Sequence, residues 1–475
     1  LSVCFVCIVV VSLFIFDQQH NHIIRAFYAK TDALVILSAT LYNNSANYPP
    51  NTVVLLANGH QLLHLKRRHL SIMAHNSSGS YAVQLRMEAV VDDIPFYCAW
   101  TPFIATGTLP AGTLRITTHD VHPRLPIELR PPFSEKHESV ICVTPLFLHD
   151  DWPTLLLSLA TSVHFGAFVV LYVRSMLSAE LSLLETLAPG SLRLSPWPSV
   201  PVFDSFDPNL HLEFRNQASA MTDCLLLYKD SAEFIFFPDI DDILIPRAGD
   251  SLYEEFKSAF QRFPQAAVIA YNMSQTAVHF NGKKESFSAS SIFSSSRLLG
   301  ESRWGKLVVR PSLVRSLWIH FSYGIKPPHR QITFPIADNS IIHLRFWKRK
   351  PPSKRERRRL GVYDPFKRGS RMPLLNQSDA SIIDKRLKIA TGHAHFQLLS
   401  ASSVYHQIIN KCYDQIFYNG ISHSTCIGPE LCSIPRLRVS CMNARGSFQA
   451  AEGDGIQLRI LHSHTLVETA NGCTL

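Results

Sequence analysis

The chain has 475 residues, of which 46% are hydrophobic and 17% are charged. This balance excludes a chain that is disordered throughout, and the length leaves room for two or three domains, or for one large α/β domain with additions. The formal net charge of +9 favours acidic partners, such as nucleotide phosphates, anionic glycans or a lipid surface, without choosing among them.

The first sixteen residues, LSVCFVCIVVVSLFIF, carry no charge. A membrane-spanning helix needs about 20 apolar residues, and the sequence begins with Leu1 rather than Met, so we expect residues 1–16 to be a signal anchor cut at its front. A cleaved signal peptide is the alternative, although no clear small-x-small cleavage site follows. A soluble core helix would rarely be apolar on every side. Residues 17–30 are then a short stem.

Cysteines and sequons point to an oxidising compartment. Five of the eight cysteines after the apolar run lie within residues 411–475, which indicates disulfides in a secretory lumen, with the pairing left open. Cys142 and Cys224 lie in apolar patterns, where buried thiols are the simpler interpretation. Four N-x-S/T sequons agree with a luminal location, at Asn43, Asn76, Asn272 and Asn376.

Residues 31–137 contain alternating stretches such as ALVILSATLY and YAVQLRMEAVV between turn residues, which predicts a β-rich accessory region. From residue 138 the pattern alternates between buried strands and helices. The first helix is expected in DWPTLLLSLATSVHFG, with Asp151 as its N-cap, and a long amphipathic helix is expected over residues 212–230. We therefore predict an α/β domain with a mainly parallel mixed sheet over residues 138–400, whose ligands lie beyond the carboxyl ends of the strands.

Two further segments complete the organisation. Residues 345–371 are basic and contain prolines, which favours an exposed loop, with a site for a phosphate or an acidic acceptor as the alternative. Nucleic acid is not an expected partner in a lumen. Residues 401–475 form a cysteine-rich C-terminal extension.

The stretch FIFFPDIDDILIPR places three aspartates inside an apolar run. Asp239 and Asp241 are two residues apart at the end of a predicted strand, so both point to one face if the strand continues that far. Two such carboxylates repel each other unless a cation lies between them or one holds a proton. Mn²⁺ or Mg²⁺ would relieve the repulsion and take further ligands from substrate phosphates. The alternative is a polar turn whose aspartates cap backbone N–H groups.

Other residues are candidates for the same site. His343, in the β-like run ADNSIIHLRF, is a possible third ligand for Mn²⁺, although a single histidine is more often a core or surface residue. Arg303 and Lys306 are expected to contact phosphates or the acceptor, and the indole of Trp304 would stack on a sugar. The alternative for these three residues is ordinary decoration of a strand edge.

Four segments occur in an order that resembles glycosyltransferase family 92: CVTPLFLHDDWPTL, RNQASAMTDCLLLYKDSAEFIFFPDIDD, RWGKLVVRPSLV and IIHLRF. The resemblance covers about residues 138–400. It implies a GT-A type nucleotide-sugar fold in a single-pass type II Golgi membrane protein with a luminal catalytic domain. It also implies inverting transfer of galactose from UDP-galactose to a glycan or glycoprotein acceptor, with Mn²⁺. By residue, Asp239 and Asp241 would be the D-x-D motif and His343 the late metal ligand. The family usually has Glu where this chain has Asp242.

In this hypothesis a carboxylate deprotonates the acceptor hydroxyl, and Asp242 and Glu301 are the two candidates for that base. Three other interpretations remain. A phosphohydrolase is disfavoured because the motif lies mid-chain and is followed by Asp242 and Ile243. A catalytically inactive, glycan-binding homologue would be signalled by the departure at Asp242. A membrane-anchored interaction protein would have aspartates that bind no metal.

Overall fold

The computed structural model describes residues 31–63, 68–91, 98–204, 206–280, 283–348, 374–400, 403–418 and 426–475. The expected signal anchor and stem, and the greater part of the basic run 345–371, lie outside these residues. Within the described part of the chain, no helix is both long and apolar enough to cross a membrane.

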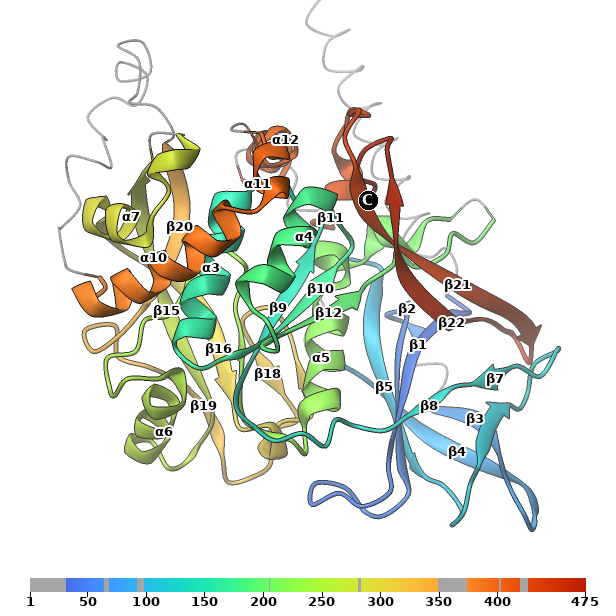
Figure 1. The fold of residues 1–475 in the computed structure, drawn as a ribbon. Helices are drawn as coiled ribbons and strands as arrows, with labels where there is room; N and C mark the ends of the chain where they lie inside the picture. Colours follow the sequence, from blue (N-terminus) through green and yellow to red (C-terminus); the bar gives the residue numbers. More distant parts are fainter. Residues whose placement is uncertain are drawn as a thin grey trace, which may run out of the picture.

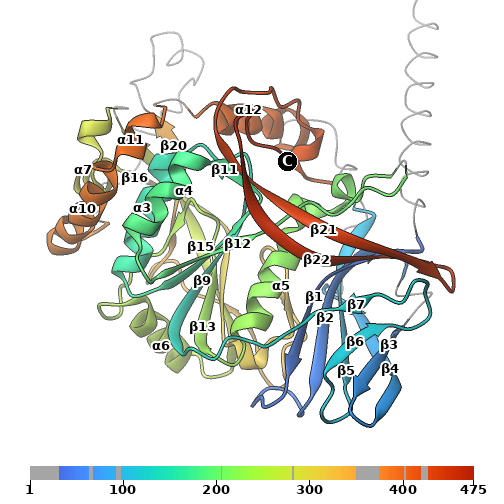
Figure 2. The same cartoon turned by 45° about the vertical axis from the view of Figure 1, so that its right-hand side comes forward.

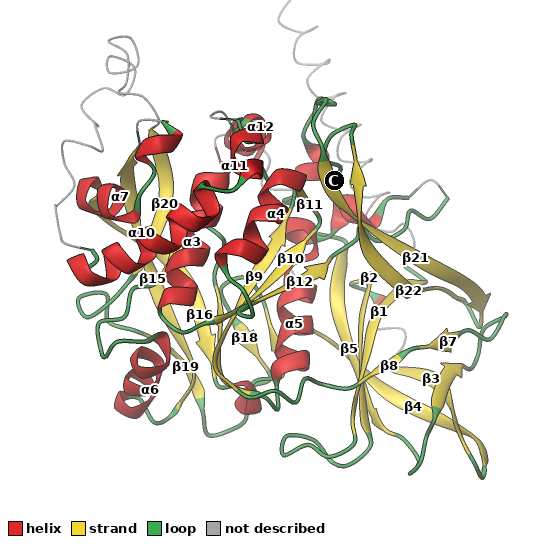
Figure 3. Cartoon of the chain, in the orientation of Figure 1, coloured by secondary structure: helices red, strands yellow, loops and turns green. Residues whose placement is uncertain are grey.

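The described residues form two lobes that lie side by side (Figure 1). Helices gather in one of them, here named the α/β lobe, whereas the other, the β lobe, consists of strands and loops (Figure 3). This arrangement confirms the predicted mixed α/β architecture and the β-rich region near the N-terminus.

The β lobe is built on one sheet. Its strands in the described residues are β1 (Ala33–Tyr42), β2 (Thr52–His60), β3 (His69–Asn76), β4 (Gly79–Ala89), β5 (Trp100–Thr108), β6 (Arg115–Thr118), β7 (Pro126–Ile127), β8 (Leu129–Arg130), β11 (Ser175–Leu177), β21 (Cys441–Gly453) and β22 (Ile456–Thr469). They follow the spatial order β11, β21, β22, β1, β2, β5, β4, β3, β6, β7, with β8 beside β1. Side chains of β1 alternate between two cores: Leu34 and Ile36 face one, and Val35 and Leu37 face the other.

The α/β lobe is built on a second sheet. Its strands in the described residues are β9 (His137–Leu146), β10 (Phe168–Val173), β12 (Leu192–Pro196), β13 (Ala232–Phe237), β14 (Asp242–Ile243), β15 (Ala266–His279), β16 (Arg297–Val309), β19 (Arg330–Thr333) and β20 (Ile341–Lys348). The spatial order is β12, β10, β9, β13, β16, β15, β20, β14, with β19 beside β15. The four strands from β12 to β13 are parallel, and β16 runs antiparallel between β13 and β15. The predicted parallel-rich mixed sheet is therefore confirmed.

Helices surround this sheet (Figure 1). They are α3 (Trp152–His164), α4 (Ser178–Leu187), α5 (Gln217–Tyr228), α6 (Leu252–Arg262), α7 (Ala289–Ser295), α10 (Gln377–Thr391), α11 (Ala394–Leu398) and α12 (Val404–Tyr413). Helix α3 begins after Asp151 as expected, but this carboxylate does not cap the backbone. It accepts hydrogen bonds from the Thr154 and Ser403 hydroxyls instead.

Helix α5 departs from the sequence prediction in two ways. It begins at Gln217, because Phe214, Arg215 and Asn216 take left-handed backbone conformations with φ of +43°, +58° and +63°. It is also buried on every side rather than amphipathic. The reason is its position between the two lobes, where Ser219 donates a hydrogen bond to Asn58 of β2.

Four disulfides are present in the described residues: Cys98–Cys426, Cys142–Cys224, Cys412–Cys432 and Cys441–Cys473. The interpretation of Cys142 and Cys224 as buried thiols is therefore wrong. Parallel packing brings β9 and α5 face to face, which places these two cysteines in contact. The bridge joins the first strand of the α/β lobe to its central helix.

The C-terminal residues return to the first described strand. Strand β22 pairs in parallel with β1, and β21 pairs antiparallel with β11. Figure 2 shows the β21–β22 hairpin running from the edge of the β lobe across to the α/β lobe. The first and last described segments thus share one sheet.

Candidate functional site

A cavity of about 690 Å³ lies beyond the carboxyl ends of β9 and β13. Ligand sites in parallel α/β sheets are expected at this edge, and the volume is in the range of small-molecule pockets. The walls come from the segment after β9, the turn before α5, strands β15, β16 and β20, and helix α12. They are lined by Thr144 to Asp151, Thr154, Phe214, Arg215, Gln217, Asp239, Ile240, Asp241, Met273, Gln275, Trp304, Lys306, Ile319, His320, His343, Leu344, His406, Ile409, Asn410 and Tyr413.

Asp239 is held by three side chains. One oxygen accepts hydrogen bonds from Thr144 Oγ1 at 2.9 Å and from Gln217 Nε2 at 3.3 Å. The other forms an ion pair with Lys306 Nζ at 2.7 Å. Burial alone would raise the pKa of Asp239, but the Lys306 ammonium outweighs it and holds this pKa well below its ordinary value.

Lys306 is buried, and its backbone position depends on the preceding glycine. A Cβ on Gly305 would lie 1.4 Å from the carbonyl oxygen of Tyr271, so no other residue fits between β16 and β15 here. Burial would lower the pKa of Lys306, but the neighbouring Asp239 and Asp242 raise it above its ordinary value. Lys306 is therefore a fixed positive charge in the cavity wall.

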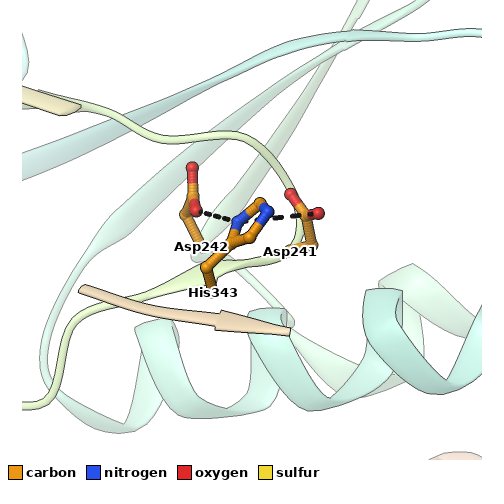
Figure 4. A group of neighbouring side chains, drawn as sticks. All are labelled: Asp241, Asp242 and His343. Carbon is orange, nitrogen blue, oxygen red and sulfur yellow. Dashed lines mark hydrogen bonds and ion pairs between the residues drawn. The ribbon is translucent and has the colours of Figure 1, made fainter. Parts of the chain in front are cut away.

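Asp241, Asp242 and His343 form a second group (Figure 4). Their positions follow from the antiparallel pairing of β14 with β20, which sets Asp242 opposite His343. His343 Nδ1 lies 2.7 Å from Asp242 Oδ1 and 3.8 Å from Asp241 Oδ2. The second Asp242 oxygen accepts a hydrogen bond from the Asp239 N–H at 3.1 Å. One ligand atom from each of the three residues lies within 4.8 Å of the other two.

The electrostatics of this group suit a cation. Burial raises the pKa of Asp241, and the neighbouring carboxylates of Asp242 and Asp239 raise it further, against the effect of His343. For His343, burial lowers the pKa, but Asp241 and Asp242 reverse the effect and raise it to about 9. Two carboxylates and an imidazole are a ligand set that Mn²⁺ accepts, and a divalent cation would relieve the repulsion between the carboxylates. The residues present therefore fit a divalent metal ion.

Some of the predicted site residues line the cavity, and others do not. Asp241, His343 and Lys306 line the cavity together, as does Asp239, which is engaged by Lys306. Asp242 lies behind them with a fully buried side chain, a position that suits a metal ligand or a partner of His343 better than a base. Glu301 and Arg303 belong to β16, but their side chains lie outside the described ones.

Among the residues of the cavity wall that had no predicted role are Thr144, Arg215, Gln217 and His320. The first three lie in the motifs CVTPLFLHDD and RNQASAM. Their position at the end of a strand or the start of a helix is the sequence feature that could have predicted them as site residues. Arg215 lies with its guanidinium 3.7 Å from the centre of the Phe147 ring. Nothing in the sequence around His320 marks it.

Comparisons with known proteins converge on one family. Residues 137–388 match the model of "Glycosyltransferase family 92". A glycosyltransferase family 92 protein of Caenorhabditis elegans is 38% identical over 489 residues, which cover 98% of this chain and 94% of the relative. A second family 92 protein of that organism is 28% identical over 443 residues, covering 90% of this chain and 87% of the relative.

Solved structures are similar at a lower level. A mannosyltransferase from Pyrobaculum calidifontis, in complex with GDP-Man and Mn²⁺, has 13% identity and a TM-score of 0.26, with 60% of this chain and 78% of that chain covered. A galactosyltransferase in complex with donor and acceptor sugar analogues has 10% identity and a TM-score of 0.20, with 37% and 58% covered. These TM-scores are low, so the assignment rests on the family model and on the relatives in sequence.

Proposed function

The chain belongs to glycosyltransferase family 92, and from that premise we propose that it moves galactose from UDP-galactose to a glycan acceptor, with inversion and with Mn²⁺. The observation that carries the proposal is the group of Asp241, Asp242 and His343, whose ligand atoms converge beside a cavity large enough for a nucleotide sugar. The choice of galactose and of inversion is supported by the resemblance to the family, and we extend the same proposal to a GT-A type fold.

In this proposal the residues of the chain divide the work. Asp241, Asp242 and His343 hold the cation, which when bound supplies positive charge to the diphosphate of the donor. Lys306 adds a second, permanent positive charge in the wall, kept in place by Asp239. Thr144 and Gln217 fix Asp239 in turn, so the leaving group meets an arrangement of charges that is already organised.

The Asp242 departure from the family pattern bears on whether the protein is active. The shorter carboxylate still reaches His343 Nδ1 at 2.7 Å and the Asp239 N–H at 3.1 Å. Both contacts are within ordinary hydrogen-bond distance. This observation favours an active transferase over an inactive homologue that only binds glycans.

We also propose a luminal location on the Golgi membrane, with residues 1–16 as a type II anchor. The four disulfides support this part of the proposal, because such bonds form and persist mainly in oxidising compartments. Microscopy of the tagged chain, with protease protection of the tag in sealed vesicles, tests it. A tag at the C-terminus that is digested without detergent would contradict the orientation.

The test of the activity is release of UDP from UDP-galactose by the purified full chain, with Mn²⁺ and with a chelator. UDP-glucose, UDP-N-acetylglucosamine and GDP-mannose are the competing donors. We expect turnover that requires the metal, prefers UDP-galactose and is lost in Asp241→Asn. Asp338→Asn is the matched control, because Asp338 pairs with Arg262 on the surface. Metal-dependent UDP binding without any turnover would support the inactive homologue instead.

A further inference from the structure

An exposed aromatic pair lies at the rim of the cavity. The Trp304 side chain lines the cavity, and the residue is 66% exposed. Phe321, which is 38% exposed, packs against it edge to face with 5.0 Å between the ring centres. Large aromatic side chains left open beside a polar cavity mark a binding surface, and the flat face of an indole suits the C–H face of a sugar ring.

The backbone ties this pair to the donor end of the cavity. Trp304 and Lys306 are two residues apart in β16, so their side chains leave the strand on the same side, about 7 Å apart along it. Lys306 contacts Asp239, and Gly305 between them fixes the strand against Tyr271. Trp304 of the aromatic pair is therefore two residues along β16 from Lys306, one of the charged groups that would hold a nucleotide diphosphate.

His320 lies beside the pair, with its ring centre 6.4 Å from that of Trp304, and it lines the same cavity. Its Nδ1 donates a hydrogen bond to the Gly305 carbonyl oxygen at 2.9 Å. A carbonyl only accepts, so Nδ1 carries the proton and Nε2 of the neutral ring has a lone pair. Burial, followed by the positive charge of Lys306, lowers the pKa of His320, which favours the neutral ring.

The acidic residues among the described side chains of the cavity wall are all engaged. Asp150 accepts hydrogen bonds from the first backbone N–H groups of α12, and Asp151 from two hydroxyls. Asp239 is paired with Lys306, and Asp241 belongs to the metal group. Within that described set, His320 is in ring contact with Trp304, and its Nε2 lone pair can accept a proton.

We propose that Trp304, Phe321 and His320 form the subsite for the acceptor sugar, with the sugar stacked on Trp304 and its reacting hydroxyl hydrogen-bonded to His320 Nε2. The subsite rests on the proposed transferase function and assigns its acceptor end. In the transfer step the hydroxyl oxygen forms a bond to the anomeric carbon of the donor. The bond from that carbon to the phosphate oxygen breaks, UDP leaves with the electron pair, and the hydroxyl proton moves to Nε2.

The experiment uses the purified full chain with UDP and Mn²⁺, and probes it with the methyl glycosides of galactose, glucose, mannose, N-acetylglucosamine and fucose. Saturation-transfer NMR reports binding of each glycoside, and UDP release from UDP-galactose reports transfer above the hydrolysis seen without glycoside. The variants are Trp304→Ala, His320→Gln and Glu301→Gln. Tyr81→Ala, an aromatic residue of β4 with 41% exposure, is the matched control.

We expect Trp304→Ala to raise the half-saturating glycoside concentration by about tenfold or more, the usual cost of truncating an aromatic anchor, with UDP affinity unchanged. His320→Gln is expected to lower the kcat of transfer about 100-fold or more, the lower range for a positioned base, with glycoside binding retained. Tyr81→Ala should change neither quantity.

Four results would overturn the subsite. One result is glycoside binding that is intact in Trp304→Ala, and another is glycoside binding that is undetectable in the wild type while UDP turnover proceeds. Either result would exclude Trp304 as the stacking surface without contradicting the transferase function. Loss of transfer in Glu301→Gln with full transfer in His320→Gln assigns the base to Glu301. A wild-type chain that neither binds UDP with Mn²⁺ nor releases it overturns the transferase function and the subsite together.

Discussion

Replacing Gly305 with alanine is predicted to damage both stability and donor binding. The new Cβ would lie 1.4 Å from the Tyr271 carbonyl oxygen, 2.3 Å from its carbonyl carbon and 2.7 Å from the Asn272 Cα. All three atoms belong to the backbone of β15, so no flexible side chain can move aside. Two neighbouring strands must separate to restore an ordinary contact distance.

The size of the effect follows from this geometry. Overpacking a well-packed site usually costs about 1–3 kcal/mol, and a clash with backbone belongs at the upper end, so we expect a loss of about 3 kcal/mol in the free energy of unfolding. The shift of β16 also carries Lys306 away from Asp239, which it contacts at 2.7 Å. A displacement of about 1 Å is enough to lower catalytic rates on the order of 100-fold.

Urea unfolding and UDP titration with Mn²⁺ measure the two effects. Gly392→Ala is the matched control, because Gly392 also has a negative φ and a Cβ there would lie 3.1 Å from the Lys388 carbonyl oxygen. The free energy of unfolding of Gly392→Ala should change by less than about 1 kcal/mol, because the Lys388 carbonyl oxygen needs to move only slightly. A Gly305→Ala chain with the unfolding midpoint and UDP affinity of the wild type would refute the argument that this strand contact positions Lys306.

Three further predictions concern the metal group, the disulfides and the sequons. His343→Gln should weaken Mn²⁺ binding at least about tenfold, because it removes the imidazole ligand and its contact with Asp242, and titration of free Mn²⁺ by electron paramagnetic resonance measures this; unchanged affinity would exclude His343 as a ligand. Removing the bridge with Cys142→Ala and Cys224→Ala should lower the free energy of unfolding by about 2–4 kcal/mol. That difference should vanish when both chains are unfolded in reductant, and a difference that persists would point to lost packing. Of the sequons, Asn43 is exposed and Asn76 is the last residue of β3, next to the turn into β4, so both should carry glycans in a secretory cell, whereas Asn272 within β15 should not. Glycopeptide mass spectrometry checks the sites, and a glycan on Asn272 would contradict its placement in the strand.

The sequence predicted those features that depend on local pattern. The apolar runs and helical spacings after residue 138 located the parallel strands, because a strand covered on both faces is hydrophobic without interruption. The same reasoning placed Asp239 and Asp241 at the end of β13, where sheet topology collects ligands. Strand and helix periodicity are properties of neighbouring residues, so a single sequence is sufficient to show them.

Other features depend on contacts between distant segments. The pairing of Asp239 with Lys306 requires β16 to lie beside β13, and no local pattern specifies that neighbour. The late start of α5 results from left-handed residues that are not glycine. Each such backbone conformation costs about 1–3 kcal/mol, which contacts with the surrounding cavity wall must offset. The Cys142–Cys224 bridge was missed for a similar reason, since apolar surroundings describe a buried disulfide as well as a buried thiol.

The return of β22 to β1 sets an order of events during synthesis. Strand β1 emerges from the ribosome among the first described residues, but its parallel neighbour β22 is made after nearly all the others. Until then one edge of β1 has unpaired N–H and C=O groups, which attract other strands. Contacts between distant segments also fold slowly. We therefore expect the nascent chain to need protection by chaperones until β22 is made, and its folding to complete only after synthesis.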